Sequence, residues 1–126
     1  MKKIIQTKNA PAPLGPYNQA ILSNDTLYIS GQIAINPATN TLELGTIEEE
    51  TALVMKNLKA VLAAADMGFE DVVKASIFIS DMGNFSKINE IYGSYFNEVT
   101  APARETVEVS TLPKNVNVEI SMIAQQ

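Results

Sequence analysis

The side chain best suited to specific chemistry in this sequence is Arg104, which is the only arginine among nine cationic residues. It lies in an alternating polar and apolar stretch over residues 101–109. A guanidinium presents a planar fork of donors that fits a carboxylate, and it keeps its charge near neutral pH. We therefore interpret Arg104 as the group that holds the carboxylate of a small substrate.

Glu119 is the second candidate for chemistry. Residues 103–110 and 116–124 both alternate, which predicts two final strands. If these strands form an antiparallel hairpin, their polar faces lie side by side and Glu119 comes within a few residues of Arg104. The pair is the best chemical constellation that the sequence offers, or it could be a plain surface ion pair worth under about 1 kcal/mol. The spacing leaves both interpretations open.

Other candidate site residues lie on predicted loops and element edges. Tyr17 ends the proline-rich loop 9–17, where it either closes over a pocket or packs the loop onto the body. Gly31 interrupts a strand, so Ser30 and Gly31 form either a simple bulge or a point where an exposed N–H meets a ligand. Asn89 lies at the edge of a helical apolar stripe, as a surface residue or a ligand donor.

Composition excludes several function classes. The chain has no histidine and no cysteine, so a zinc or copper site is not expected and a Ser-His-Asp hydrolase is excluded. The net charge of −5 argues against non-specific nucleic-acid binding. The apolar runs are too short to span a bilayer, and the first residues show no secretion signal. We expect a cytoplasmic protein with no cofactor.

The order of elements predicts a single α+β domain over residues 1–126. Strands are expected at 3–8, 19–22, 26–35, 71–80, 103–110 and 116–124, with helices at 46–67 and 84–97. Thr46 and Glu49 predict a capping box at the start of the first helix. Right-handed crossovers should place both helices on one face of a mixed six-stranded sheet.

Side-chain alternation assigns faces to two of these strands. In strand 26–35, one face should carry Leu27, Ile29, Ile33 and Ile35. In strand 71–80, one face should carry Val73, Ala75, Ile77 and Ile79. The sheet face without helices is semi-polar but carries Tyr28, Val72 and Phe78, so we expect other copies of the chain to bury it.

Several short motifs, taken together, resemble the Rid family of reactive intermediate deaminases, also called the RidA/YjgF family. The resemblance covers essentially the whole chain, and the joint order of the motifs is highly specific. Its residues are Gly15-Pro16-Tyr17, Ser30-Gly31-Gln32, Asn57-Leu58, Asp81-Met82, Phe85, Asn89, Tyr92, Phe96, Pro102-Ala103-Arg104, Leu112-Pro113 and Glu119.

The resemblance implies a chorismate-mutase-like fold and a homotrimer with a central barrel and three clefts between subunits. It also implies hydrolysis of 2-iminobutanoate and 2-iminopropanoate, which arise from enamines released by PLP-dependent dehydratases, to 2-oxo acids and ammonia. By position, Arg104 would bind the substrate carboxylate and Glu119 would orient or activate water. The residues that would help to hold the substrate are Tyr17, Ser30, Gly31, Asn89 and Thr106. No metal is implied.

Two positions depart from the pattern of many relatives. Thr106 stands where many enamine-deaminating members have a cysteine, which casts doubt on thiol-dependent behaviour more than on hydrolysis. Glu105 follows Arg104 directly and should point away from it. A non-catalytic module that binds 2-oxo acids, and less readily an RNA-directed activity, are the alternative functions.

Overall fold

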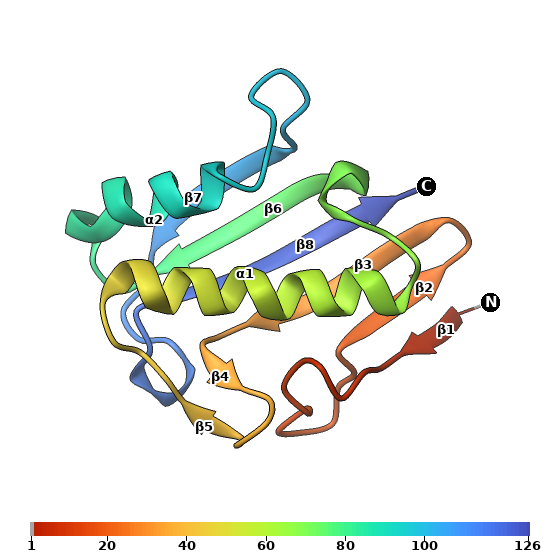
Figure 1. The fold of residues 1–126 in the computed structure, drawn as a ribbon, viewed down its shortest axis with the longest axis horizontal. Helices are drawn as coiled ribbons and strands as arrows, with labels where there is room; N and C mark the ends of the chain where they lie inside the picture. The colour runs from red at the N-terminus through yellow and green to blue at the C-terminus, as the bar shows by residue number, and fades with distance from the viewer. Residues whose placement is uncertain (1) are drawn as a thin grey trace.

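A computed structural model describes residues 2–126 and shows a six-stranded sheet with two helices on one side (Figure 1). The strand order is β1-β2-β3-β8-β6-β7, and every neighbouring pair is antiparallel except β6 and β7, which are parallel. The strands of this sheet are β1 (Lys2–Ile5), β2 (Ala20–Ser23), β3 (Thr26–Gln32), β6 (Val72–Ile79), β7 (Ala103–Glu108) and β8 (Val118–Gln125). A separate ribbon pairs β4 (Ile35–Asn36) with β5 (Thr41–Leu42).

The long helix α1 (Ile47–Ala64) begins as the sequence predicts. Thr46 accepts a hydrogen bond from the Glu49 backbone while the Glu49 side chain accepts one from the Thr46 backbone, which completes the capping box. The helix ends earlier than the expected residue 67, because the chain turns at Asp66 with a positive φ of 57°. The short helix α2 (Phe85–Gly93) likewise ends before residue 97, in a series of turns.

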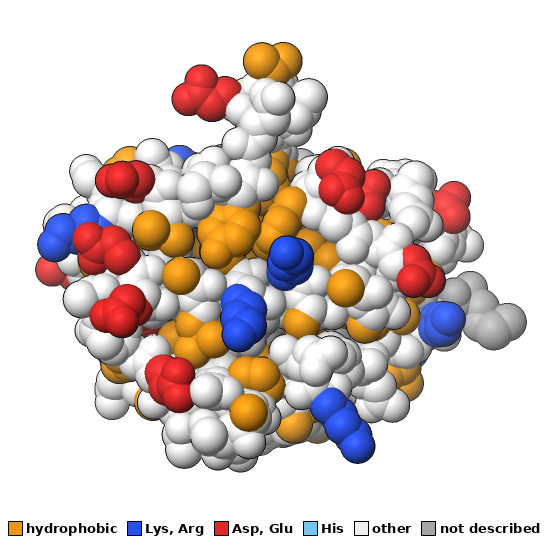
Figure 2. Space-filling view, viewed as in Figure 1, with side chains coloured by type: hydrophobic (Ala, Val, Ile, Leu, Met, Phe, Trp, Pro, Cys, Tyr) orange, Lys and Arg blue, Asp and Glu red, His pale blue; other side chains and the backbone are white. Residues whose placement is uncertain are grey.

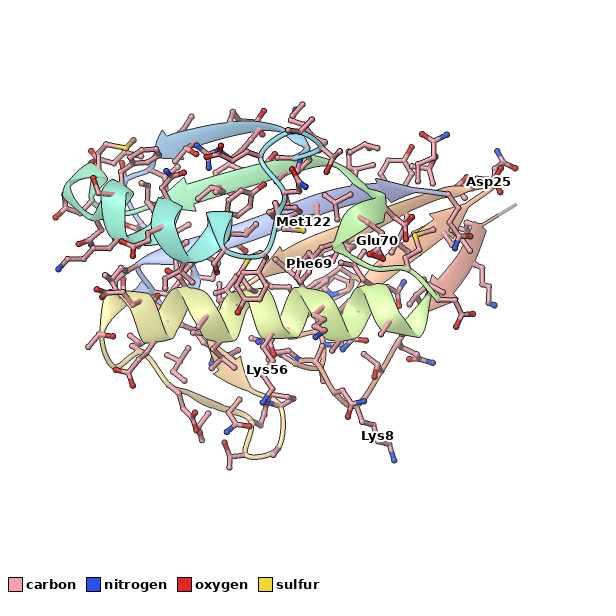
Figure 3. All side chains as sticks on the ribbon, turned by 45° about the horizontal axis from the view of Figure 1, so that its top comes forward. Lys8, Asp25, Lys56, Phe69, Glu70 and Met122 are labelled. Carbon is pink, nitrogen blue, oxygen red and sulfur yellow. The ribbon has the colours of Figure 1, made fainter. Side chains whose placement is uncertain are left out.

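The main hydrophobic core fills the layer between the helices and the sheet. From α1 it receives Val54, Leu58, Val61 and Leu62, all fully buried, which form the apolar stripe of the helix. Met122 of β8 belongs to this core, and Phe69, at the start of the 3-10 turn Phe69–Asp71, packs against it (Figure 3). Further 3-10 turns lie at Met82–Asn84 and Pro113–Asn115. Among residues 2–126, no helix is long and apolar enough to cross a membrane.

The predicted hairpin between the last two strands is wrong. In the sheet, β6 lies between β7 and β8. The physical reason is that β6, α2 and β7 form a strand–helix–strand unit, whose second strand returns parallel to its first and occupies the sheet edge. The final strand β8 is then inserted between β3 and β6, where both of its sides are paired.

Two irregularities in the ladders correct the predicted faces. Between β3 and β8 the register shifts between Ile29 and Gln32, so Ile33 and Ile35 leave the main core and join a second apolar cluster. That cluster consists of Ile33, Ile35, Leu112 and Val116, with Phe78 packed against it. A similar shift in β6 buries Val72 and exposes Val73, the reverse of the expectation. The first strand covers residues 2–5 rather than 3–8.

The sheet face opposite the helices is partly apolar. Tyr28 and Val107 are exposed there, beside a polar group in which the Lys74 ammonium lies 2.9 Å from the Glu105 carboxylate. The Ser76 hydroxyl also donates to Glu105. Coverage of this face by other copies of the chain remains a prediction.

Candidate functional site

Arg104 lies on the edge strand β7 with its side chain under α2. Its Nη1 donates to Asn89 Oδ1 at 2.7 Å. The guanidinium carbon lies 5.2 Å from the ring centre of Tyr92 and 5.7 Å from that of Phe85. These are cation–π distances, and the Arg104 side chain stays exposed. One hydrogen bond to Asn89 leaves further N–H donors for an incoming carboxylate.

The spacing of α2 explains how three of its residues reach Arg104. Phe85, Asn89 and Tyr92 stand at positions i, i+4 and i+7, so they share one helix face. The sequence predicted Asn89 as a candidate, whereas Phe85 and Tyr92 were named only among the residues that carry the family resemblance and received no site role. Their helical spacing with Asn89 was the available signal that they belong with it.

Thr106 and Tyr92 bring two hydroxyl groups to the same region. Thr106 follows Arg104 by two residues on β7 and so shares its face. Within residues 2–126, both Thr106 Oγ1 and the Tyr92 hydroxyl are buried without a hydrogen-bond partner. Burial raises the pKa of Tyr92, partly opposed by the nearby positive charge of Arg104, so the hydroxyl keeps its proton. Both hydroxyls are therefore unused hydrogen-bonding groups that this single chain buries.

Glu119 lies against Gly31 at the β3 bulge. Ser30 and Gly31 together oppose Ser121 of β8, the two-against-one pattern of a bulge. A Cβ atom on residue 31 would lie 2.5 Å from a Glu119 carboxylate oxygen and 2.8 Å from its carboxyl carbon. Residue 31 must therefore be glycine if the carboxylate is to keep this place. Partial burial raises the pKa of Glu119.

A small pocket of about 70 Å³ opens beside Glu119 and Gly31, with Tyr17 at its wall. The Tyr17 hydroxyl accepts a hydrogen bond from the Leu14 backbone at 3.2 Å, which ties the tyrosine to its own loop, and its side chain remains exposed. Near the pocket, the Ser30 hydroxyl donates to the Asn18 carbonyl at 2.6 Å. The proline-rich loop and the bulge thus form the walls of one small site.

The structure separates the candidate residues into two groups on opposite sheet faces. Ala75 of β6 pairs with Arg104 on one side and with Met122 on the other, and Ala75 and Met122 lie in the core beneath the helices. Glu119 is three residues from Met122, so its side chain projects from the other face. We call Asn89, Arg104 and Thr106 the arginine group, and Tyr17, Ser30, Gly31 and Glu119 the glutamate group.

Within one chain, then, Arg104 and Glu119 form neither an ion pair nor a joint site, and the expected closeness through a hairpin is wrong. Glu105 does point away from Arg104, because its partners Lys74 and Ser76 lie on the open face. No three acidic side chains within residues 2–126 lie close enough together to hold a metal ion. On the helix-bearing side, acidic side chains surround a few basic ones, without the continuous basic surface typical of nucleic-acid binding (Figure 2).

Comparison with known proteins places this geometry in context. A family model described as "Endoribonuclease L-PSP" matches residues 7–126. A RutC family protein of Synechocystis is 54% identical over 97% of this chain and 95% of its own length. The bovine 2-iminobutanoate/2-iminopropanoate deaminase is 43% identical over 100% of this chain and 91% of its own length. The crystal structure of a Rid family protein from Yersinia pestis superposes on this one with a TM-score of 0.96. The superposition covers 100% of each chain, and the two sequences are 50% identical.

Proposed function

Because this chain belongs to the Rid family, we propose that it hydrolyses reactive 2-imino acids, with 2-iminobutanoate and 2-iminopropanoate as substrates, to 2-oxo acids and ammonia. The observation that carries the proposal is the single guanidinium held by Asn89 between two aromatic rings, with donors left for a carboxylate. A relative of 43% identity bears the name of this activity. The net charge of −5 and the lone arginine do not favour the endoribonuclease activity that the name of the family model suggests.

The proposed site is shared between copies of the chain. A small imino acid cannot touch both sheet faces of one chain, yet the chemistry needs a carboxylate holder and a water-activating group together. In a homotrimer with clefts between subunits, the arginine group of one copy faces the glutamate group of the next. Such head-to-tail contacts close into a ring and would also bury the partly apolar open face.

The chemistry proposed for this cleft needs no cofactor. Arg104 holds the substrate carboxylate, and the imine carbon next to it is electrophilic. Glu119 takes a proton from water as the water oxygen bonds to that carbon, and the proton passes to the imine nitrogen. The carbinolamine then loses its carbon–nitrogen bond, and its hydroxyl proton leaves with the nitrogen as ammonia. A carboxyl whose pKa is raised toward neutrality suits both accepting and returning a proton.

The test is a coupled assay in which threonine dehydratase is supplied with threonine and the formation of 2-oxobutanoate is followed. The wild-type protein should accelerate 2-oxobutanoate formation. Arg104→Ala should lower kcat/KM by about 100-fold or more, since hydrogen bonds to charged groups contribute about 1.5–3 kcal/mol each. Carboxylate binding by the wild type without any acceleration would instead indicate the alternative function, a module that senses 2-oxo acids.

A further inference from the structure

Two fully buried polar side chains of α1, Glu50 and Asn57, have no part in the proposed chemistry. They stand seven residues apart, about two helical turns, so both project from the helix face that meets the sheet. Neither bonds to α1 itself. Each binds a backbone segment next to one member of the Glu119–Gly31 pair.

Glu50 holds the start of β8. Its Oε2 accepts hydrogen bonds from the backbone N–H of Asn117 at 2.8 Å and of Val118 at 3.3 Å, and its Oε1 accepts one from the Asn117 side-chain amide at 2.7 Å. A carboxylate can accept several bonds at once, which suits three converging donors. The segment held in this way leads directly into Glu119.

Asn57 holds the chain that leaves the bulge. Its side-chain amide donates to the carbonyls of Ile33 at 3.2 Å and Ile35 at 3.0 Å, the two ends of a tight turn that begins two residues after Gly31. Since both partners are acceptors, the amide nitrogen must face them. Among the described residues, the buried Asn57 Oδ1 is left without a partner, which costs about 1–3 kcal/mol. The side chain thus holds this turn despite an unpaired oxygen.

The β3–β8 ladder alone cannot fix Glu119 relative to Gly31, because its register is interrupted between Ile29 and Gln32, where Gly31 lies. The carboxylate of Glu119 nevertheless needs a defined place, since it lies so close to residue 31 that no Cβ would fit there. The two α1 contacts lie just beyond this interruption, on the side of the Gln32–Ile120 pair: one holds the segment that follows β3, and the other holds the start of β8.

We infer that Glu50 and Asn57 are positioning residues, which fix Glu119 against Gly31 from the opposite face of the sheet. The inference rests on the proposed function for its effect on turnover. Arg104 is held by α2 and not by these contacts. Loss of either α1 side chain should therefore disturb the water-activating group and leave the carboxylate holder intact.

The experiment compares Glu50→Ala and Asn57→Leu with Thr51→Ala. Thr51 is a matched control, because it is also fully buried on α1 but its hydroxyl bonds only to the Ile47 carbonyl of the same helix, at 2.8 Å. With kcat expressed per folded protomer, both test variants should lose about 10- to 100-fold in kcat, as expected for a misplacement near 1 Å. Their KM should stay within about twofold, and Thr51→Ala should leave both parameters within about twofold.

A conservative replacement separates positioning from bulk stability. Glu50→Gln keeps one acceptor oxygen in place and should recover much of the kcat that Glu50→Ala loses. If Glu50→Ala does not fold, Asn117→Ala removes only the side-chain donor and should give a smaller loss in kcat. The inference is overturned if Thr51→Ala loses as much kcat as the test variants, if the loss lies in KM, or if Glu50→Gln is no better than Glu50→Ala.

A crystal structure of Asn57→Leu gives a readout that does not need activity. The Glu119 carboxyl should shift by about 1 Å or more relative to residue 31, while Thr51→Ala leaves it in place. An unmoved carboxyl overturns the inference. Wild-type protein that fails in the dehydratase assay refutes the proposed function instead, and the structures of the variants still decide whether α1 fixes this pair.

Discussion

The arginine group and the glutamate group solve different positioning problems. Arg104 is exposed on the edge strand β7, and the contacts that hold it are side-chain contacts from one short helix. Glu119 is half-buried on a central strand, against a bulge, and α1 is bonded to the backbone segments that follow the bulge and precede Glu119. A guanidinium keeps its charge in any surroundings, so orientation is sufficient. A carboxylate that must exchange protons near neutral pH also needs burial to set its pKa.

The largest effect should come from removing the titrating group. Glu119→Gln keeps the size of the side chain but cannot accept a proton, so kcat should fall by about 100- to 10,000-fold with little change in KM. Arg104→Lys keeps the charge but loses the planar fork, so its main effect should be a raised KM. Steady-state kinetics on the two variants tests this contrast. If both variants showed the same fall in kcat and the same rise in KM, the two groups would not differ in their roles.

Mixing two inactive variants tests whether the two groups meet across a subunit boundary. When Arg104→Ala and Glu119→Gln chains are co-expressed, random assortment in a ring pairs an intact Arg104 with an intact Glu119 at about one interface in four. Activity should return to about a quarter of the wild-type value. Each variant purified alone is the control. A mixture as inactive as its components would show that the site does not combine residues from two copies.

The smallest effect concerns stability against pH. The pKa of Glu119 is raised in the folded protein, so the folded state holds this proton more tightly than the unfolded chain does. Stability is therefore lost as pH rises from the ordinary glutamate pKa through the raised one. Glu119→Gln has no titrating group at this position and so does not lose this stability. Its Tm should slightly exceed that of the wild type at pH 7 and match it at pH 4. Thermal unfolding followed by circular dichroism measures both, and a variant less stable at pH 7 would contradict burial as the cause.

The helices and most strands could be predicted from the sequence because their signals are local. The capping box at Thr46 and the apolar stripe of α1 depend on residues within a few turns of one another. The order of the strands in the sheet could not be predicted from local signals. The alternation of residues 103–124 does not indicate that β6 lies between the last two strands, since that order follows from the crossover through α2.

The candidate site was predicted residue by residue, but its arrangement was not. Arg104 and Glu119 stood out by residue type, and Asn89 by its place at the edge of a helical apolar stripe; the hydrogen bond between Asn89 and Arg104 is seen only in the structure. Their separation onto two sheet faces depends on long-range pairing. No site role was predicted for Glu50 or Asn57, because a polar residue on a helix gives no local sign that it will be buried against a distant strand.

The second apolar cluster of Ile33, Ile35, Leu112 and Val116 gives the pocket beside Glu119 a foundation of its own. Those four side chains form a cluster separate from the main core, yet Leu44 packs against both clusters and Asn57 of α1 donates to the Ile33 and Ile35 carbonyls. The pocket floor is therefore joined to the helix layer by hydrogen bonds as well as by packing.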